Sequence, residues 1–470
     1  MGRKTTDKIV FNNVAVLDAG AKGVSVAKAP DGKVIFIPNV VPGDVVDVQT
    51  FKKRKAYYEG KAVHFHEYSA DRVIPPCQHF GACGGCKWQN MQYEKQLYYK
   101  NREVYNHLKR IGKIELPEFE PIKGSDEKFF YRNKMEFSFS NARWMTDNEL
   151  QSGHPFTDRN ALGFHIPRMW DKILDITKCH LQGDPSNAIR NTVRDFANEH
   201  GMEFFNPREH SGLLRTLMIR TASTGEIMVL VQFFDDNKEQ RELLLDHLAY
   251  TFPSITSLQY VINQKANDTL YDQKIILYKG RNYILEEMEG LKFSINAKSF
   301  YQTNSAQAYE LYKITRDFAG LTGNELVYDL YTGTGTIAQF VSRMAKKVIG
   351  VESVPEAIAD AKENAIRNNI TNCEFFVGDM KEVFNEDFIK THGHPDVIIT
   401  DPPRDGMHKD VVEQILRIAP EKVVYVSCNS ATQARDLALM DEAYQVVRVR
   451  PVDMFPQTHH VENVVLLQKR

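Results

Sequence analysis

The stretch Leu326-Val-Tyr-Asp-Leu-Tyr331-Thr332-Gly-Thr-Gly-Thr336 decides the fold of the C-terminal part of this 470-residue chain. Its first six residues form a mostly apolar run typical of a buried strand, and a glycine-rich turn follows. Beyond the turn, helical and strand-like patterns alternate strictly as far as the run Val397-Ile-Ile-Thr-Asp401. This alternation predicts an α/β domain built on a parallel, doubly wound sheet.

The glycine turn and the next strand ends carry side chains suited to a nucleoside. Gly333 and Gly335 let the backbone turn tightly, and Glu352, at the end of the second strand, is placed to accept hydrogen bonds from ribose hydroxyls. The third glycine of a dinucleotide fingerprint is absent, which disfavours NAD, whose pyrophosphate rests on the helix end. An adenosine with a tail that lacks phosphate fits better, with Asp379 near the adenine and Asp401 near the reacting end.

A cysteine ends the next apolar strand. Val423-Val-Tyr-Val426 is followed by Ser-Cys428, and a thiol at the carboxyl end of such a strand opens into the ligand crevice. Most free cysteines are inert. Beside a methyl donor, however, Cys428 can add to C6 of a pyrimidine and make C5 nucleophilic. Glu462 is the candidate base that removes the C5 proton. The alternative interpretation is that Glu462 is an ordinary surface residue.

The bulk composition sets broad limits. A chain of 470 residues predicts two or three domains, and 42% hydrophobic with 26% charged residues is typical of a soluble globular protein. The net charge of −2 gives no global sign of nucleic-acid binding, so local basic patches must meet any such partner. No apolar run approaches a membrane span, and Met1-Gly-Arg-Lys-Thr-Thr6 lacks the apolar core of a secretory signal. We therefore expect a cytoplasmic protein that does not enter the membrane.

Residues 8–67 predict a small all-β unit. Short β-rich runs, among them Val34–Ile37 and Val45–Val48, alternate with turn signals. Lys52-Lys-Arg-Lys55 precedes Tyr57-Tyr58, and basic residues beside aromatics suit RNA, where cations meet phosphates and rings stack on bases. A solvated turn with two half-buried tyrosines is the alternative.

Three of the six cysteines lie within ten residues: Cys77, Cys83 and Cys86. In a reducing compartment such a cluster indicates a metal site or catalysis. Cys179 is the best fourth ligand. Zinc and a [4Fe–4S] cluster both accept four thiolates, and His79 or His180 could replace a thiol for zinc. The spacing alone does not choose between the metals.

The segment between these parts predicts a helix over 91–111 and a mixed α+β region over 124–290. Residues 187–200 and 238–250 read as helices. Arg132 and Lys134 lie on a strand-like run, where they could face substrate phosphates or solvent.

Five motifs together resemble the RNA uracil-C5 methyltransferase family over nearly the whole chain. They are Phe300-Tyr-Gln-Thr-Asn304, Asp329-Leu-Tyr-Thr-Gly-Thr-Gly-Thr336, Asp401-Pro-Pro-Arg404, Ser427-Cys-Asn429 and Asp453-Met-Phe-Pro-Gln-Thr-His-His-Val-Glu462. The first residues, notably Asp31-Gly-Lys-Val-Ile-Phe-Ile-Pro38 and Val41-Pro-Gly-Asp-Val-Val46, resemble a TRAM domain, a small RNA-binding β-barrel. With the cysteine set, they resemble the branch that modifies 23S ribosomal RNA and carries a [4Fe–4S] cluster.

The resemblance implies three domains: a TRAM-like, OB-like barrel over 1–67, a central α+β domain with the cluster over 68–290, and a Rossmann-like class I methyltransferase domain over 291–470. It implies that S-adenosylmethionine is bound by Gln302, Tyr331, Glu352, Asp379 and Asp401. It implies Cys428 as nucleophile and Glu462 as base, and it assigns the cluster to Cys77, Cys83, Cys86 and Cys179, with Arg132 as a possible substrate contact.

The expected substrate is 23S ribosomal RNA or its precursor, and the expected state is a monomer. Branches of the family that act on tRNA commonly lack the TRAM-like and cluster parts, so tRNA is the alternative. A non-catalytic RNA-binding protein is disfavoured because both Cys428 and Glu462 are present.

Overall fold

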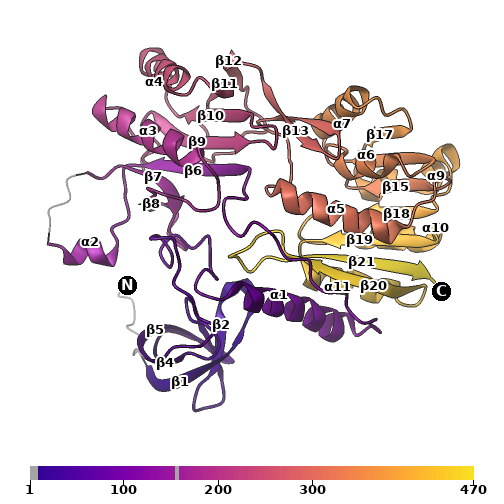
Figure 1. Ribbon diagram of the computed structural model, residues 1–470, viewed down its shortest axis with the longest axis horizontal. Coiled ribbons are helices and arrows are strands. Elements are labelled where there is room, and N and C mark those ends of the chain that lie inside the picture. The colour runs from indigo at the N-terminus through magenta and orange to yellow at the C-terminus, as the bar shows by residue number, and fades with distance from the viewer. Residues whose placement is uncertain (1–8, 154–157) are drawn as a thin grey trace.

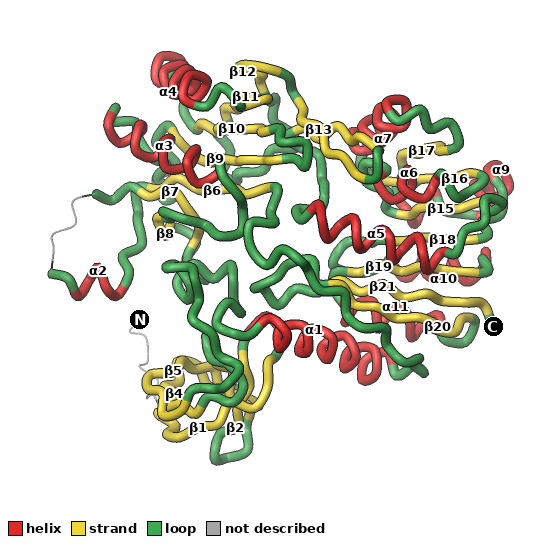
Figure 2. Tube along the Cα trace, in the orientation of Figure 1, coloured by secondary structure: helices red, strands yellow, loops and turns green. Residues whose placement is uncertain are grey.

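The computed structural model describes residues 9–153 and 158–470, and the expectation made for Met1–Thr6 lies outside them. A small barrel, a central sheet and a C-terminal sheet follow one another along the chain (Figure 1). The helices flank the two large sheets, and long loops join the three parts (Figure 2).

The N-terminal part is an all-β barrel, as predicted. Its strands are β1 (Val10–Ala19), β2 (Ser25–Lys28), β3 (Val34–Ile37), β4 (Val45–Lys53) and β5 (Tyr57–Glu67). They close in the order β1-β2-β3-β5-β4, with β3 and β5 paired in parallel. Alternate side chains such as Ile35, Val46 and Val48 are fully buried inside, as the two-residue period of a strand requires.

The basic turn between β4 and β5 departs from the sequence interpretation in one respect. Lys53-Arg-Lys55 is exposed, whereas the Lys52 ammonium lies 2.6 Å from the Glu59 carboxylate. Tyr58 is buried in the barrel, and its hydroxyl donates to Asp31 at 2.8 Å. Tyr58 therefore cannot stack on a base, because its ring is committed to the barrel core.

The helix predicted over 91–111 joins the barrel to the C-terminal sheet. It is observed as α1 (Tyr93–His107), continued by one π-helical turn over Leu108–Gly112. Val104 and Leu108 are fully buried in a core that also contains Tyr425 and Tyr444 of the C-terminal sheet. α1 is thus fixed to the C-terminal sheet, although it precedes the central part in sequence (Figure 1).

The central part is a seven-stranded sheet in the order β12-β11-β10-β9-β6-β7-β8. Its strands are β6 (Lys134–Ser140), β7 (Ala161–His165), β8 (Ile173–Asp175), β9 (Leu214–Thr221), β10 (Ile227–Phe233), β11 (Ile255–Ile262) and β12 (Ile276–Gly280). α3 (Ser186–Glu199) and α4 (Lys238–Thr251) pack against it as predicted, and a short helix, α2, spans Asp147–Gln151. The hairpin of β13 (Tyr283–Met288) and β14 (Leu291–Asn296) leads to the last part.

The C-terminal sheet has the order β17-β16-β15-β18-β19-β21-β20. Its strands are β15 (Leu326–Leu330), β16 (Lys347–Glu352), β17 (Cys373–Val377), β18 (Val397–Thr400), β19 (Lys422–Ser427), β20 (Tyr444–Val452) and β21 (Glu462–Lys469). The first five are parallel, as predicted. The prediction of a wholly parallel sheet is wrong, because β21 runs antiparallel to both β19 and β20. The short connection from β20 to β21 permits only a hairpin, since a parallel pair needs a longer crossover.

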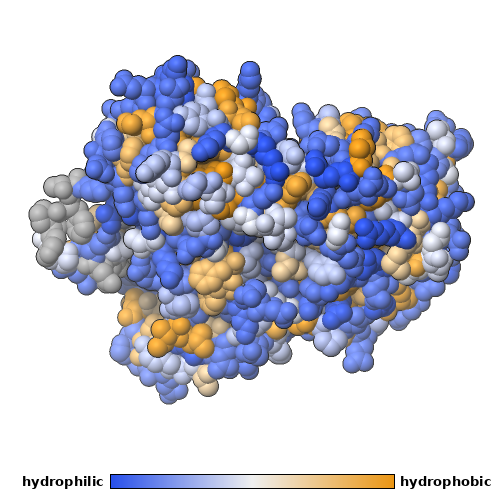
Figure 3. Space-filling model, turned by 45° about the horizontal axis from the view of Figure 1, so that its top comes forward, coloured by the Kyte–Doolittle hydropathy of each residue, from blue (hydrophilic) through white to orange (hydrophobic). Residues whose placement is uncertain are grey.

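Seven helices that accompany this sheet are α5 (Ser305–Ala319), α6 (Thr336–Ser342), α7 (Pro355–Arg367), α8 (Met380–Val383), α9 (Glu386–His392), α10 (Lys409–Ile418) and α11 (Ser430–Met440). None of the helices in 9–153 and 158–470 combines the length and apolar character needed to cross a bilayer. The face seen in Figure 3 is mostly hydrophilic, with apolar side chains in small separate groups.

Candidate active site and cysteine cavity

Cys428 lies directly after β19, where the strand gives way to α11. Val423–Val426 of β19 are fully buried, so the strand has apolar contacts on both faces. The Asn429 side chain accepts a hydrogen bond from the Ala431 amide at 3.2 Å and caps α11. The strand and the cap together hold the half-buried Cys428 at the carboxyl end of the sheet.

Two carboxyl groups lie within electrostatic reach of this thiol. Burial raises the pKa of Cys428 to about 11, and the charges of Glu462 and Asp401 add to the increase. Burial also raises the pKa of Asp401 to about 7 and, with the nearby Asp401, that of Glu462 to about 8. In the part of the chain that the structure describes, neither carboxyl accepts a hydrogen bond. The two carboxyls therefore have no direct hydrogen-bonding or ion-pair partner among the described residues.

Arg404 supplies one cation beside this group, a placement that the sequence interpretation did not assign. Its charge lowers the pKa of both Cys428 and Glu462 against the larger effect of burial. Its guanidinium donates to His460 Nδ1 at 2.9 Å, and Asn429 Nδ2 donates to the Arg404 carbonyl at 3.0 Å. Burial and Arg404 lower the pKa of His460 to about 4, so this ring is a neutral acceptor. The sequence contains a signal for this placement, because Arg404 follows Asp401 closely in the motif Asp401-Pro-Pro-Arg404.

The glycine turn contacts the end of β16. The Gly333 amide donates to Glu352 Oε2 at 3.2 Å, and the amides of Ser353 and Val354 donate to Oε1 at 2.7 and 3.1 Å. Gly333 has a φ of 55°, and a side chain at this position would meet nothing within 4 Å. By contrast, a side chain at Gly335 would meet the Phe375 ring at 2.9 Å. The turn thus keeps one open side, at Gly333.

The remaining predicted nucleoside contacts lie around this turn. Burial and the charge of Asp379 raise the pKa of Tyr331 to about 12. Asp379 is exposed and accepts from the Lys381 amide at 3.1 Å, so it also caps α8. Gln302 is half-buried, and its carbonyl accepts from Asn133 Nδ2 at 2.9 Å. No hydrogen bond joins Gln302 to the turn within the described residues.

Asp329, which enters the sequence interpretation only as part of a motif, is a third buried acid. Burial raises its pKa to about 7, although the Thr332 hydroxyl and the Ala338 amide donate to it. The charge of Asp401 contributes to this increase. Burial raises the pKa of Tyr312 on α5, and the charges of Asp401, Asp329 and Glu462 add to the increase. Three acids therefore share one weakly solvated region.

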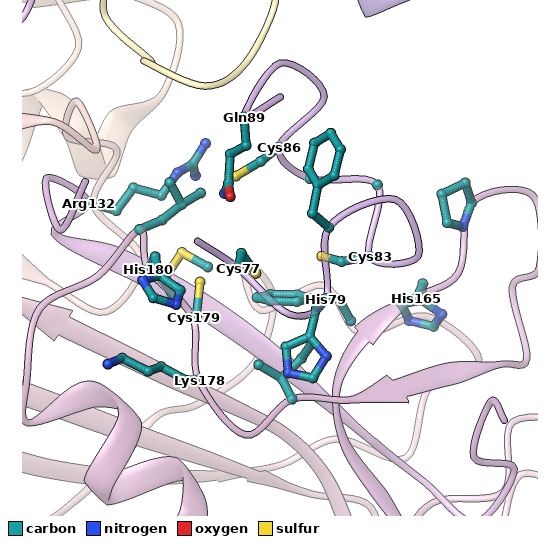
Figure 4. A pocket seen from close by; sticks show the side chains of 18 residues that line it. Cys77, His79, Cys83, Cys86, Gln89, Arg132, His165, Lys178, Cys179 and His180 are labelled. Carbon is teal, nitrogen blue, oxygen red and sulfur yellow. The ribbon is translucent and has the colours of Figure 1, made fainter. Parts of the chain in front are cut away.

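The four predicted metal-binding cysteines line a single cavity of about 360 Å³ (Figure 4). Cys77, Cys83 and Cys86 come from the loop before α1, and Cys179 comes from the loop after β8. Burial raises the pKa of Cys83 to about 11 and that of Cys86 to about 12. These thiols would stay protonated near neutral pH unless a bound cation stabilised their thiolate form.

The loop that carries Cys179 is held by α3. Asn187 Oδ1 accepts from the Cys179 amide at 2.8 Å, and Asn187 Nδ2 donates to the Cys179 carbonyl at 3.1 Å. Arg190 is fully buried and donates to Asn187 and to the carbonyls of Ile176 and Thr177. Both backbone groups of Cys179 are therefore fixed before any metal binds.

No set of three or more histidine, cysteine or acidic side chains within the described ranges lies close enough to hold a single metal ion. His79 Nε2 accepts from the Thr177 amide at 3.2 Å, so this nitrogen is already in use. Arg132 also lines the cavity, where its Nε has no hydrogen-bond partner in the described structure (Figure 4).

Comparison with known proteins bears on the whole architecture. Residues 269–470 match the tRNA (Uracil-5-)-methyltransferase family. An RNA methyltransferase of Bacteroides thetaiotaomicron is 59% identical over 96% of this chain and its own entire length. One of Chlorobaculum tepidum is 37% identical over 97% of this chain and 96% of its own.

A solved structure shows the same fold. The Pyrococcus abyssi tRNA (uracil-54, C5)-methyltransferase in complex with S-adenosyl-L-homocysteine has a TM-score of 0.74 and 27% identity, covering 97% of this chain and 100% of that one. The chain therefore belongs to the RNA uracil-C5 methyltransferase family and is an S-adenosylmethionine-dependent enzyme.

Proposed function

We propose that this chain transfers a methyl group to C5 of a uridine in 23S ribosomal RNA or its precursor, with Cys428 as nucleophile and Glu462 as base. The observation that carries the proposal is the half-buried thiol within electrostatic reach of two buried carboxyls, Asp401 and Glu462, which Arg404 offsets only in part. Such a site fits a cationic methyl donor, because a sulfonium would offset the acids. The open side of Gly333 leaves room for the donor's nucleoside.

Gln302, Tyr331, Glu352, Asp379 and Asp401 would hold S-adenosylmethionine, which supplies an electrophilic methyl group when bound. Glu352 ends β16 with Oε2 directed at the Gly333 amide of the turn, a position that suits a ribose contact. Asp401 would face the reacting end. Asp379 is exposed beside Tyr331, as an adenine contact would require.

Cys428 acts first on the uracil ring. Its thiolate adds to C6, the C5–C6 π electrons move toward O4, and C5 becomes nucleophilic. After C5 has gained the methyl group, Glu462 removes the C5 proton. The electron pair of that C–H bond re-forms the double bond, and the C6–S bond breaks to release the thiolate. A carboxyl with a pKa of about 8 is well placed for proton transfer near neutral pH.

The cysteine cavity fits a [4Fe–4S] cluster better than zinc. Four thiols line one cavity but are not close enough to share one ion. In a cluster each thiolate binds a different iron, so the ligands stand farther apart. We propose Cys77, Cys83, Cys86 and Cys179 as its ligands, and the fixed backbone of Cys179 supports this set.

The same chemistry on tRNA is a second candidate, which a specific observation favours. The Pyrococcus abyssi enzyme named for tRNA covers 97% of this chain, so a tRNA enzyme can span the whole three-part architecture. The barrel and the central part therefore do not by themselves select ribosomal RNA. The resemblance of the cysteine set and the barrel to the 23S branch keeps ribosomal RNA first.

We retain the domain division 1–67, 68–290 and 291–470, a monomeric state, a cytosolic location and a substrate contact by Arg132 as parts of this proposal. The exposed Lys53-Arg-Lys55 turn would add a phosphate contact.

The deciding experiment incubates the purified protein and methyl-labelled donor with deproteinised 23S RNA or with total tRNA from a strain that lacks the protein. We expect labelled 5-methyluridine in 23S RNA alone. Label in tRNA alone would move the proposal to the second candidate, and label in neither or at another base would overturn it.

A further inference from the structure

The loop 453–461, which precedes Glu462, is held by a glutamine pair. Gln96 on α1 and Gln457 in the loop are both buried, with 1% and 5% of their surface exposed. Gln96 Nε2 lies 3.0 Å from Gln457 Oε1, and the Gln457 amide donates to Gln96 Oε1 at 3.0 Å. The two residues are 361 positions apart, so these bonds join distant segments.

The same Gln96 amide also holds the cysteine-bearing segment. Its Nε2 lies 2.9 Å from the carbonyls of both Trp88 and Met91. The Trp88 amide in turn donates to the Gln457 carbonyl at 3.0 Å, and Trp88 is two residues beyond Cys86. The two hydrogens of Nε2 are thus shared among three acceptors, so no other side chain of this shape could replace the glutamine.

Gln457 occupies a backbone conformation that needs outside support. Its φ is 68°, in the left-handed region that non-glycine residues rarely adopt. Such a conformation persists where the surroundings fix it. The loop is fixed at its other end as well, because the Lys100 ammonium lies 2.5 Å from the buried Asp453 carboxylate. α1 therefore contacts the loop at both of these points.

We infer that Gln96 is a positioning residue for methyl transfer, which acts by fixing the loop from which Glu462 enters the sheet. The inference rests on the proposed role of Glu462 as base. Glu462 is the first residue of β21 and pairs with Val452 across the loop. A loop released at Gln457 would misplace the carboxyl relative to the C5 proton, whereas Cys428, which lies on β19, would keep its position.

The consequence is a selective defect in the last step. With Gln96→Met, an unbranched apolar side chain of similar length, addition to C6 and methyl transfer proceed, but proton removal slows. We expect kcat to fall by about 10- to 100-fold. The methylated protein–RNA adduct, stable to denaturant, should accumulate during turnover, while KM for the methyl donor stays within about twofold.

The matched control is Gln92→Met. Gln92 precedes Gln96 by one helical turn, but its Nε2 donates to the Ala70 carbonyl at 3.0 Å and not to the loop. The Gln92→Met variant should have the same kcat and the same adduct level as the unaltered protein. A second variant, Gln457→Gly, adopts the left-handed backbone without strain and removes only the side-chain link. It should accumulate adduct to a smaller extent than Gln96→Met.

Glu462→Gln, measured in parallel, separates the two hypotheses. If it leaves no adduct, the proposed base is wrong. If it traps adduct while neither Gln96→Met nor Gln457→Gly does, Gln96 serves only the fold and the inference is overturned. Adduct in both glutamine variants, together with its absence in Gln92→Met, supports the inference.

Discussion

The active site and the cysteine cavity both bury thiols, but opposite charges surround them. Cys428 lies among the acids Asp401 and Glu462, whereas Cys179 lies beside Arg190, a buried cation with no ion pair among the described residues. Burial lowers the pKa of Arg190 to about 10, and the nearby Cys179 opposes that decrease. A buried charge without a counter-charge is costly. The comparison teaches that the site around Cys428 is suited to a cationic ligand, whereas the cysteine cavity is suited to cysteines in their thiolate form.

Removal of the proposed catalytic thiol should give the largest effect. Cys428→Ala removes the proposed nucleophile, so methyl transfer should fall by more than about 10⁴-fold, while the metal content of the protein stays the same. Cys373→Ala is the matched control, because this half-buried cysteine of the same sheet faces the Ala338 carbonyl. Radiolabel transfer and iron analysis check both variants. Substantial activity in Cys428→Ala would exclude it as nucleophile.

Loss of a thiol from the cysteine cavity should affect metal binding and leave the reactivity of Cys428 unchanged. The anaerobically purified protein should be brown and contain iron and sulfide in equal amounts. Cys86→Ser should weaken metal retention against a chelator by at least about 10- to 100-fold, with Cys428 still reactive toward uracil. A colourless protein that contains zinc alone would overturn the cluster.

The acids should make activity and stability respond to pH in opposite directions. As the proposed base, Glu462 must be ionised to act, so single-turnover product release should rise by about tenfold per pH unit up to about pH 8. The folded state favours its protonated form, so its stabilising contribution is complete below pH 4.5 and is lost as the pH rises through about 8. Rapid-quench rates and melting curves check the two trends. In Glu462→Gln the rate increase that belongs to this group should vanish.

The basic turn belongs to neither thiol region and should give the smallest effect. Alanine at Lys53, Arg54 and Lys55 should weaken RNA binding a few-fold and reduce the slope of log K against log salt by about 0.7 to 0.9 per lost phosphate contact. Lys238→Ala on α4 serves as the control. Titrations at several salt concentrations measure both, and an unchanged slope would make the turn an ordinary solvated loop.

Local patterns predicted the fold well because they report which faces are buried. The runs 348–352 and 397–401 were predicted within one residue, since parallel strands buried on both faces are continuously apolar. The edge strand 373–377 is only partly buried, and its bounds were predicted as well. The last strand, with its run Val464-Val-Leu-Leu467, was predicted, but its antiparallel direction was not, because that direction depends on the connection from β20. The position of Cys428 at the carboxyl end of a buried strand was predicted from the apolar run before it. The Gln96–Gln457 bonds join segments 361 positions apart, so neither local sequence contains a signal for them.

The placement of β21 has a consequence for biosynthesis. β20 has no neighbour in the sheet until β21, which is made after it, fills the gap beside β19. β20 can therefore join this sheet only together with β21 or after it. Glu462 joins Cys428 and Asp401 only when β21 docks, so a nascent chain on the ribosome could expose its thiol to RNA before it could complete a reaction.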